Sequence, residues 1–405
     1  IVLCCLFISA AVIKTKNYNT TKISKLKNRI VIIMFDGFGM NYYNNSEMPY
    51  LKSAIKKGFL KQVNALMPTV TNANNTSICT GTFPETNGIT GNTFLDENGH
   101  EEYMEDKKLV LAPTIFQTLK SLNIRSALIA SKKKSVGLLS NGADIVISPE
   151  IADTFWTNKL GIPVSIYSAD INYWSMKAGL YLLENRKDIE CLYIHTTDYP
   201  MHMWAPQDSN SLDHLKQMDL YIKKINEIAP DAMILITADH DVNHKNLCVD
   251  IERSLKEKGI TIKTAISAEK DKYLKHHRGF GGASYVYLNN VNDKEKVTVA
   301  LYKLKGIEKV YTREEAAKKY HLMDKRIGDL VVLADSMTVF GILENVAEEK
   351  LPATYRSHGS EYELKVPIII LNATKIPEPD YFIYNKDLTS WLFEKKYHST
   401  IFNAN

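Results

Sequence analysis

The sequence predicts a doubly wound α/β protein with a mainly parallel sheet and a smaller inserted α+β cap domain. Near-continuous apolar runs alternate along the chain with longer amphipathic stretches. This pattern is typical of parallel strands covered by helices on both faces. Several of the apolar runs also end abruptly in Asp or His. Polar ligands at strand ends suit the edge of an open α/β sheet, where such folds place their binding sites.

The core elements follow in order along the chain. Strands are expected at 30–35, 125–130, 143–147, 191–195 and 232–237, with a last one beginning at Val366. Helices are expected at 49–58, 113–122, 168–184 and 209–228. Most consecutive strands are therefore separated by a helix, as parallel strand pairs require.

Residues 246–345 have a different pattern. Their strand-like and helical runs lie at 283–288, 328–334, 293–305 and 313–320. The stretch stands between segments that both carry ligand-type residues, so we expect it to form a cap domain over the active site. The metal-binding catalytic core then comprises 29–245 and 346–405.

Length and composition indicate a globular chain with ample core. The 405 residues are 45% hydrophobic, and the net charge is only +4. Basic and acidic residues are interspersed, which gives no basic stripe of the kind that binds nucleic acid. The five cysteines show no zinc-finger or CxxC spacing, and we expect Cys79 and Cys191 to be buried free thiols.

The first 28 residues are interpreted as a signal or linker segment. An apolar run over 1–13 is typical of a signal-peptide h-region, and a first β-strand is the open alternative. Export is therefore expected, with a cytoplasmic location as the alternative. Membrane association is expected only if this apolar segment is retained.

Six residues at strand ends are the candidate metal ligands. They are Asp36, Asp198, His202, Asp239, His240 and His358. Three Asp and three His can form two three-ligand sets, each with an open coordination position, as hydrolytic zinc requires. Three His ligands favour zinc over magnesium, while manganese and iron remain alternatives.

A stretch rich in Thr, Asn and Ser spans 67–81, and Gly-Ile-Thr-Gly-Asn ends at Asn92. Such residues are typical of a helix N-terminus, where free N–H groups and the helix dipole favour an anion. A hydroxyl placed there can act as a nucleophile. The stretch alone fits a capped helix with polar turns equally well.

In their order along the chain, these motifs resemble the alkaline phosphatase superfamily. They are Asp36-Gly, Pro68-Thr-Val-Thr71 with a following Asn and Thr-Gly, Gly-Ile-Thr-Gly-Asn92, Asp198-x-x-x-His202, Asp239-His240 and the late His358. Within the superfamily they are most similar to the type I phosphodiesterase/nucleotide pyrophosphatase branch. The resemblance runs from about 29 to 372.

Three segments narrow the resemblance to the phosphonoacetate hydrolase family. They are 68–78, 196–206 and Arg356-Ser-His-Gly. That family also carries Lys-x-Lys after the strand beyond the nucleophile, and Lys132-Lys133-Lys134 follows the strand at 125–130 here. Without this context the run would be interpreted as a solvated loop. At a strand's carboxyl end, two lysines can bind a substrate carboxylate.

The resemblance implies two Zn²⁺ ions per chain. One ion would be held by Asp36, Asp239, His240 and Thr71, and the other by Asp198, His202 and His358. The implied function is hydrolysis of the C–P bond of phosphonoacetate to acetate and phosphate.

The resemblance also assigns roles around the reacting phosphorus. Thr71 would attack as an alkoxide, and Asn92 would donate to a phosphoryl oxygen. Lys132 and Lys134 would bind the acetate carboxylate. Water activated at the second zinc ion would then hydrolyse the phosphothreonine.

A phosphodiesterase or nucleotide pyrophosphatase on the same scaffold is the main alternative. Its substrate, like phosphonoacetate, would be a small phosphorus compound and not a nucleic acid. Sulfatases are disfavoured because the chain lacks a Cys/Ser-x-Pro-x-Arg motif, and phosphoglycerate mutases because the nucleophile position is Thr. A non-catalytic relative is disfavoured because no ligand is missing. The oligomeric state stays open, with a homodimer among the alternatives.

The remaining candidates receive smaller roles. His195 lies inside a strand and is interpreted as a core histidine, and His244 as a loop residue beside the ligands. His276 and His277 are candidates for reaching the substrate from the cap. Asp241 stands where the family commonly has Gly after Asp-His, which puts the shape of that loop in question.

Overall fold

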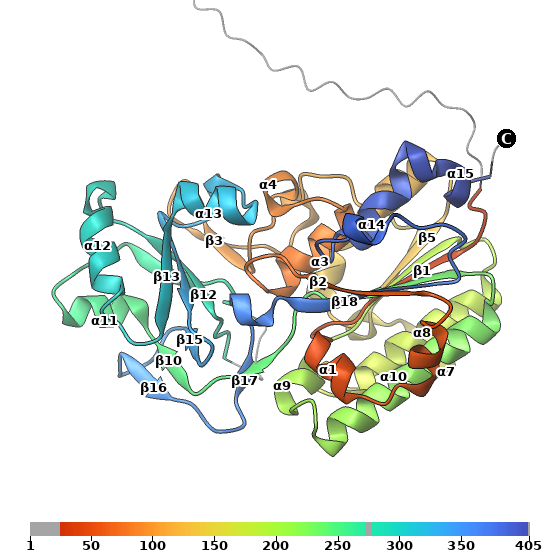
Figure 1. Cartoon of the computed structure of the whole chain (residues 1–405), viewed down its shortest axis with the longest axis horizontal. Helices are drawn as coiled ribbons and strands as arrows, with labels where there is room; N and C mark the ends of the chain where they lie inside the picture. Colours follow the sequence, from red (N-terminus) through yellow and green to blue (C-terminus); the bar gives the residue numbers. More distant parts are fainter. Residues whose placement is uncertain (1–24, 273–277, 404–405) are drawn as a thin grey trace, which may run out of the picture.

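A computed structural model describes residues 25–272 and 278–403 and shows a seven-stranded central sheet (Figure 1). The strand order is β2 (Phe59–Asn64), β18 (Lys365–Leu371), β8 (Met233–Thr237), β1 (Ile30–Met34), β7 (Cys191–His195), β5 (Ser126–Ala130) and β6 (Ile145–Ile147). The five strands from β8 to β6 are parallel, and β18 is antiparallel to both β8 and β2. The predicted α/β class with a mainly parallel sheet is confirmed.

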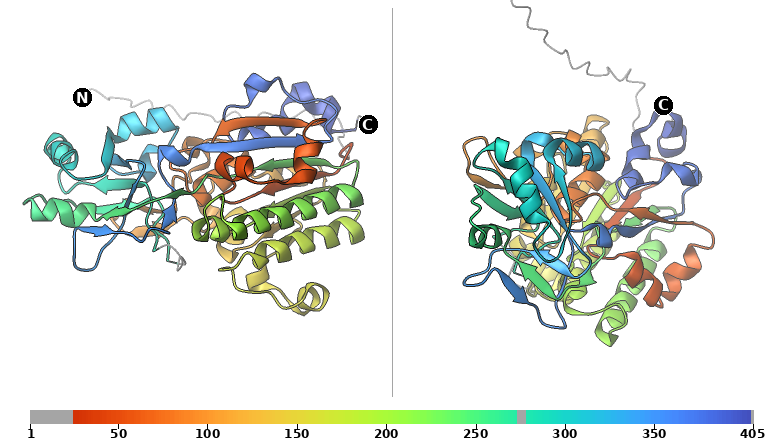
Figure 2. Two further views of the ribbon diagram at one scale, coloured as in Figure 1. Left: turned by 60° about the horizontal axis from the view of Figure 1, so that its bottom comes forward. Right: turned by 60° about the vertical axis from the view of Figure 1, so that its left-hand side comes forward.

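Helices cover both faces of this sheet. The long helices α8 (Asp170–Asn185) and α10 (Ser209–Ile228) lie side by side along one face (Figure 2). On the opposite face, α3 (Thr71–Thr80) packs against α14 (Asp387–Ser390). The strands β1, β5, β7 and β8 are fully buried, which explains their continuous apolar sequences.

Two departures from the sequence expectation bear on the core. The edge strand β2 was not predicted, because Lys61 and Gln62 interrupt its apolar residues. It is held by an antiparallel ladder with β18 and not by burial of both faces. The lysine run, which without the family context would be interpreted as a solvated loop, enters a helix, α6 (Lys133–Leu139).

A second, antiparallel sheet lies beside the core. Its order is β11 (Thr264–Ser267), β12 (Ala283–Tyr287), β14 (Leu330–Ala334) and β13 (Ile307–Thr312). The helices α11 (Ile251–Glu257), α12 (Lys294–Leu301) and α13 (Arg313–Tyr320) accompany it (Figure 1). Residues within 246–345 thus build α+β structure, while the domain boundaries themselves stay a prediction.

The second sheet packs directly on the segment that leads into α3. Met67 and Val70 from that segment share one apolar cluster with Tyr285 of β12 and Val331 of β14. The chain immediately before Thr71 is therefore held between the two sheets. The cap and the core together define where α3 begins.

Shorter elements complete the described chain. The helices are α1 (Met40–Asn45), α2 (Pro49–Ala54), α4 (Pro84–Asn87), α5 (Ile115–Ser121), α7 (Thr154–Leu160), α9 (Tyr199–Met203) and α15 (His398–Ile401). The strands are β3 (Thr93–Leu95), β4 (Glu101–Tyr103), β9 (Asn243–His244), β10 (Leu247–Val249), β15 (Thr338–Phe340), β16 (Glu348–Lys350) and β17 (Arg356–Ser357). Cys79 and Cys191 are buried free thiols, as predicted.

Some expectations concern residues outside the described part. Most of the 1–28 segment lies there, as do His276 and His277. Export stays a prediction for this reason. Within the described residues, none of the helices is both long enough and apolar enough to cross a membrane.

A fully buried ion pair ties β9 to the segment that follows β17. Lys245 Nζ lies 2.8 Å from Glu363 Oε1, and both side chains are buried. Asn243 Nδ2 donates to the same oxygen at 3.0 Å. The other oxygen accepts from the backbone N–H and the hydroxyl of Ser360. The network sets the path of the chain directly after His358.

We predict that Lys245→Ala lowers the free energy of unfolding by about 3–5 kcal/mol, because it leaves the Glu363 carboxylate buried without its cation. Urea denaturation followed by circular dichroism measures this. Lys57→Ala, at an exposed lysine, should change it by less than about 0.5 kcal/mol. A loss below about 1 kcal/mol for Lys245→Ala would contradict the account.

Candidate active site

The register of the parallel strands brings three aspartates to one edge of the sheet. Met34 at the end of β1 lies opposite His195 of β7 and Thr237 of β8. The chain then turns polar in all three places, at Asp36, Asp198 and Asp239. Parallel strands end at the same edge, so these side chains meet there. All three aspartates are buried.

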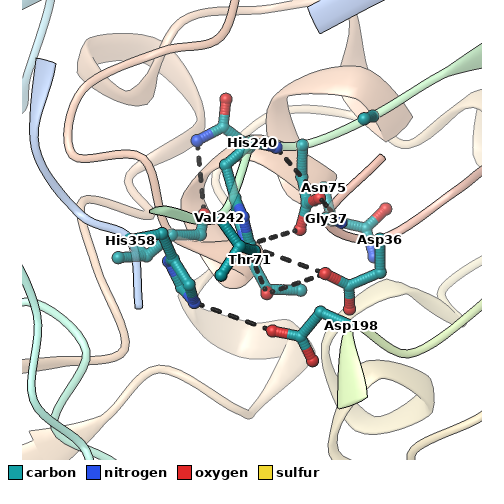
Figure 3. A network of polar contacts seen from close by, with 12 residues as sticks. Asp36, Gly37, Thr71, Asn75, Asp198, His240, Val242 and His358 are labelled. Atoms are coloured by element: carbon teal, nitrogen blue, oxygen red, sulfur yellow. Dashed lines mark hydrogen bonds and ion pairs between the residues drawn. The ribbon is translucent and has the colours of Figure 1, made fainter. Parts of the chain in front are cut away.

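Thr71 is the first residue of α3 and points into this cluster (Figure 3). Its Oγ1 lies 3.3 Å from His240 Nε2 and 3.5 Å from Asp36 Oδ1. The turn before the helix is held by Asn74, whose amide bonds to both the N–H and the carbonyl of Leu66. The predicted nucleophile therefore stands beside two of its predicted ligand partners.

Each of the three predicted histidine ligands bonds through Nδ1 to a backbone carbonyl. The pairs are His202 with Arg356 at 2.8 Å, His240 with Asp241 at 3.0 Å, and His358 with Thr69 at 2.7 Å. A carbonyl only accepts, so Nδ1 must donate in each case. Every Nε2 is thereby directed to the site, as in metal centres where a second partner sets the ring.

The ligand atoms form two overlapping groups. In one, His202 Nε2 lies 2.9 Å and His358 Nε2 3.6 Å from Asp198 Oδ2. In the other, atoms of Asp36, Asp198 and His240 all lie within 4.8 Å of one another. Asp239 adjoins the second group, with Oδ2 3.3 Å from His240 Nε2. All six predicted ligands are brought together.

This arrangement fits metal ions. Imidazole nitrogens with protonated Nδ1 and ionised carboxylates are both acceptors, so at these separations they repel unless a cation or a proton lies between them.

Burial lowers the pKa of His358, but the charges of Glu269 and Asp198 outweigh burial and raise it to about 9. Burial together with the His358 charge lowers the pKa of His240 to about 3.

Lys132 places a positively charged side chain within the cluster of predicted metal ligands. Its Nζ lies 3.1 Å from Asp198 Oδ1 and 3.7 Å from Asp36 Oδ2, and the side chain is only 7% exposed. Burial disfavours the charged ammonium form of Lys132. The negative charges of Asp198 and Asp36 have the larger effect and raise its pKa. Burial and the Asp198 charge raise the pKa of Asp36, but Lys132 and His195 lower it to about 2.

His195 has a role that sequence reasoning missed. It is fully buried in β7, as a core histidine should be. However, its Nε2 lies 3.4 Å from Asp36 Oδ2, and its Nδ1 lies 3.0 Å from Asn75 Nδ2. Tyr193 donates to the other end of that amide. His195 thus positions a predicted metal ligand, a role that its place on a strand did not reveal.

Asn92 is connected to the metal-ligand cluster by Glu269, a residue that the sequence analysis did not identify. Its Nδ2 lies 3.1 Å from Glu269 Oε2, and Glu269 Oε1 lies 3.8 Å from His358 Nε2. Burial raises the pKa of Glu269 to about 7. Glu269 follows β11, far along the chain from the ligand motifs. The only available signal was the cluster Glu269-Lys-Asp271 shortly before His276.

The other lysine of the predicted pair, Lys134, contacts the same cap segment. It forms an ion pair with Asp271, and both side chains are almost completely buried. His244 lies in β9, opposite Arg356 of β17, and not in a loop. Asp241 lies directly against Gly39. A Cβ atom added at Gly39 would lie 2.0 Å from the Cγ atom of Asp241.

The model of the type I phosphodiesterase/nucleotide pyrophosphatase family matches residues 30–361. The chain belongs to this family. It is thereby a hydrolase by family, as predicted, and the core adopts the fold expected for the alkaline phosphatase superfamily.

Solved structures refine the comparison. Phosphonoacetate hydrolase from Sinorhizobium meliloti 1021, in complex with phosphonoacetate, has a TM-score of 0.81 and 28% identity. The match covers 90% of this chain and 95% of that one. Murine ectonucleotide pyrophosphatase/phosphodiesterase 5 has a TM-score of 0.66 and 17% identity, over 93% of this chain and 96% of that one. The latter likeness shows the fold alone.

Among curated proteins, human bis(5'-adenosyl)-triphosphatase is 23% identical over 239 residues. The match covers 55% of this chain and 49% of that protein. The orangutan (Pongo abelii) protein matches over the same shares. The chain thus spans about half the length of the curated relatives it matches.

We predict that chelator-treated protein rebinds zinc at the Asp/His cluster and gains thermal stability, because a ligand that binds only the folded state stabilises it. Asp198→Asn and His202→Ala should each lose about half of the bound zinc, since the two residues belong to the same predicted set of ligands. Plasma mass spectrometry after gel filtration measures the content. His321→Ala, away from the cluster, is the control. Unchanged zinc in Asp198→Asn would disprove the assignment.

Proposed function

We propose that this chain is a di-zinc hydrolase that cleaves the C–P bond of phosphonoacetate through a phosphothreonine at Thr71. The observation that carries the proposal is a pair of lysines with buried side chains: Lys132 lies 3.1 Å from Asp198 of the cluster that surrounds Thr71, and Lys134 is paired with Asp271. A small substrate that joins a phosphonate to a carboxylate needs a nucleophile and two cations in this arrangement. The resemblance to phosphonoacetate hydrolase over most of both chains supports it.

Asp36, Asp239, His240 and Thr71 would hold one zinc ion, and Asp198, His202 and His358 the other. When bound, the ions supply positive charge that favours the Thr71 alkoxide and neutralises the phosphoryl oxygens. The protein contributes fixed positions for these groups, because backbone carbonyls orient all three histidine rings.

The reaction proceeds in two displacements. The Thr71 oxygen attacks phosphorus, the C–P bond breaks, and its electron pair stays on the acetate carbon and its carboxylate. The ammonium groups of Lys132 and Lys134 stabilise this charge until the carbon takes a proton from water. A water molecule then attacks phosphorus, the P–O bond to Thr71 breaks, and phosphate leaves. Phosphonoacetate and water thus give acetate and phosphate.

A phosphodiesterase or nucleotide pyrophosphatase activity is the second candidate. The family match and the bis(5'-adenosyl)-triphosphatase relatives favour it. The chemistry at Thr71 would be the same, with an alkoxide as the leaving group. The two candidates differ in what binds that group, since a nucleotide base requires an aromatic slot and a carboxylate requires cations.

We predict that zinc-loaded protein releases phosphate from phosphonoacetate and that Thr71→Ala lowers this rate by at least about 10³-fold, because the covalent route is lost. Phosphate release is measured beside hydrolysis of p-nitrophenyl thymidine monophosphate. Comparable zinc content in the variant excludes a metal-loading defect. A preference for the nucleotide diester would replace the proposed substrate with the second candidate.

We predict that Lys134→Met lowers kcat/KM for phosphonoacetate by about 10–100-fold, because a hydrogen bond to a charged group contributes roughly 1.5–3 kcal/mol. Lys133→Met, at the exposed lysine of the same run, should stay within about twofold. If Lys134→Met impairs the nucleotide diester equally, Lys134 does not bind the carboxylate.

A further inference from the structure

A large pocket adjoins the lysines of the proposed carboxylate site. Its volume is about 960 Å³, and Lys132 and Lys134 both contribute to its wall. The chain after α7 also contributes to the wall, where Val164, Ile166 and Tyr167 line the space. This chain segment connects α7 to α8 and carries none of the residues proposed above for catalysis.

The lining of the pocket is chemically mixed. Lys132 connects this pocket to the metal ligands, because it lines the pocket and its Nζ lies 3.1 Å from Asp198. The segment after α7 contributes apolar side chains that are partly open to solvent: Pro163 and Ile166 are half-buried, and Val164 is 45% exposed. Apolar side chains that line a pocket in this state gain stability when a ligand covers them. The pocket thus combines lysines with apolar side chains, and the carboxylates of Glu105, Asp106 and Glu150 line it as well.

The acetate leaving group fills only a small part of this space. Its four heavy atoms occupy on the order of 120 Å³, at about 30 Å³ per water-sized atom. The pocket is about eight times larger. Pockets that bind substantially larger molecules have volumes of roughly 300–1,000 Å³. The site therefore has room for a leaving group with many more atoms than acetate.

We propose that this pocket is a leaving-group subsite for phosphonates whose carboxylate-bearing carbon also carries an apolar substituent of several carbons. The inference rests on the proposed function for the position of phosphorus at Thr71 and of the carboxylate at the lysines. The substituent then lies along Val164 and Ile166. The substrate class is thereby 2-alkyl phosphonoacetates, with phosphonoacetate as the smallest member.

The test compares phosphonoacetate, 2-phosphonobutanoate and 2-phosphonooctanoate, which differ only in the alkyl chain. Calorimetric titration of zinc-loaded Thr71→Ala protein measures binding without turnover, and phosphate release from the unaltered enzyme measures kcat/KM. A fully buried methylene changes affinity about fourfold. Since the pocket is partly open, we expect at least a tenfold gain in affinity from the ethyl to the hexyl substituent.

Val164→Trp places a large side chain in the pocket and tests directly whether the alkyl chain binds there. It should abolish the gain with chain length while leaving phosphonoacetate within about twofold. Ile162→Trp is the matched control, because Ile162 lies two residues away, is 86% exposed and is not in the pocket wall. It should leave the gain intact.

The outcomes separate the two proposals. A gain in affinity that Val164→Trp removes supports the subsite, even if no phosphonate is hydrolysed, in which case only the proposed reaction fails. Equal or weaker binding of 2-phosphonooctanoate overturns the subsite while phosphonoacetate turnover still supports the reaction. A gain that survives Val164→Trp also overturns it, because the alkyl chain then binds elsewhere. If none of the three compounds binds, both proposals fail.

Discussion

The rest of the site depends on one constraint, the meeting of three buried carboxylates at one edge of the sheet. Asp36, Asp198 and Asp239 are each fully or almost fully removed from water. Burial and the charge of Asp36 push the pKa of Asp239 well above its ordinary value. Such a group of like charges is tolerated only when cations or protons compensate it. Lys132 and His358 lie beside these oxygens for that reason.

The lysines of the site lie at the N-terminus of α6, where their positive charge destabilises the helix. Lys132 caps α6, and Lys133 and Lys134 occupy its first turn. Cations at a helix N-terminus oppose the helix dipole, at roughly 0.3–1 kcal/mol each. The buried contacts of Lys132 with Asp198 and of Lys134 with Asp271 offset this cost. A solvated loop would have neither the cost nor the contacts.

The sequence predicted the core and its ligands because both are local signals. An apolar run that ends in Asp, as at Asp36 and Asp239, identifies a strand and the edge where it stops. Glu269 and Asp271 could not be predicted this way, because they reach the site by packing of a distant cap segment. The role of His195 was missed for a related reason, since a buried strand histidine and one that bonds a ligand carboxylate have the same pattern. Edge strand β2 is polar enough to be read as a loop, and only its ladder with β18 makes it a strand.

The segments that carry Thr71 and His358 are joined by three hydrogen bonds between side chains and backbone groups. Thr69 Oγ1 donates to the carbonyl of Ser360 at 2.8 Å and accepts from the N–H of Gly359 at 2.9 Å, while its own carbonyl accepts from His358 Nδ1. The nucleophile and a ligand of the second set therefore keep a fixed separation, which phosphoryl transfer requires. Lys134 is held instead by its ion pair with Asp271. A substitution at Asp271 can thus alter the choice of leaving group while the contacts of Thr69 are retained, so the chemistry follows from the fold more directly than the substrate does.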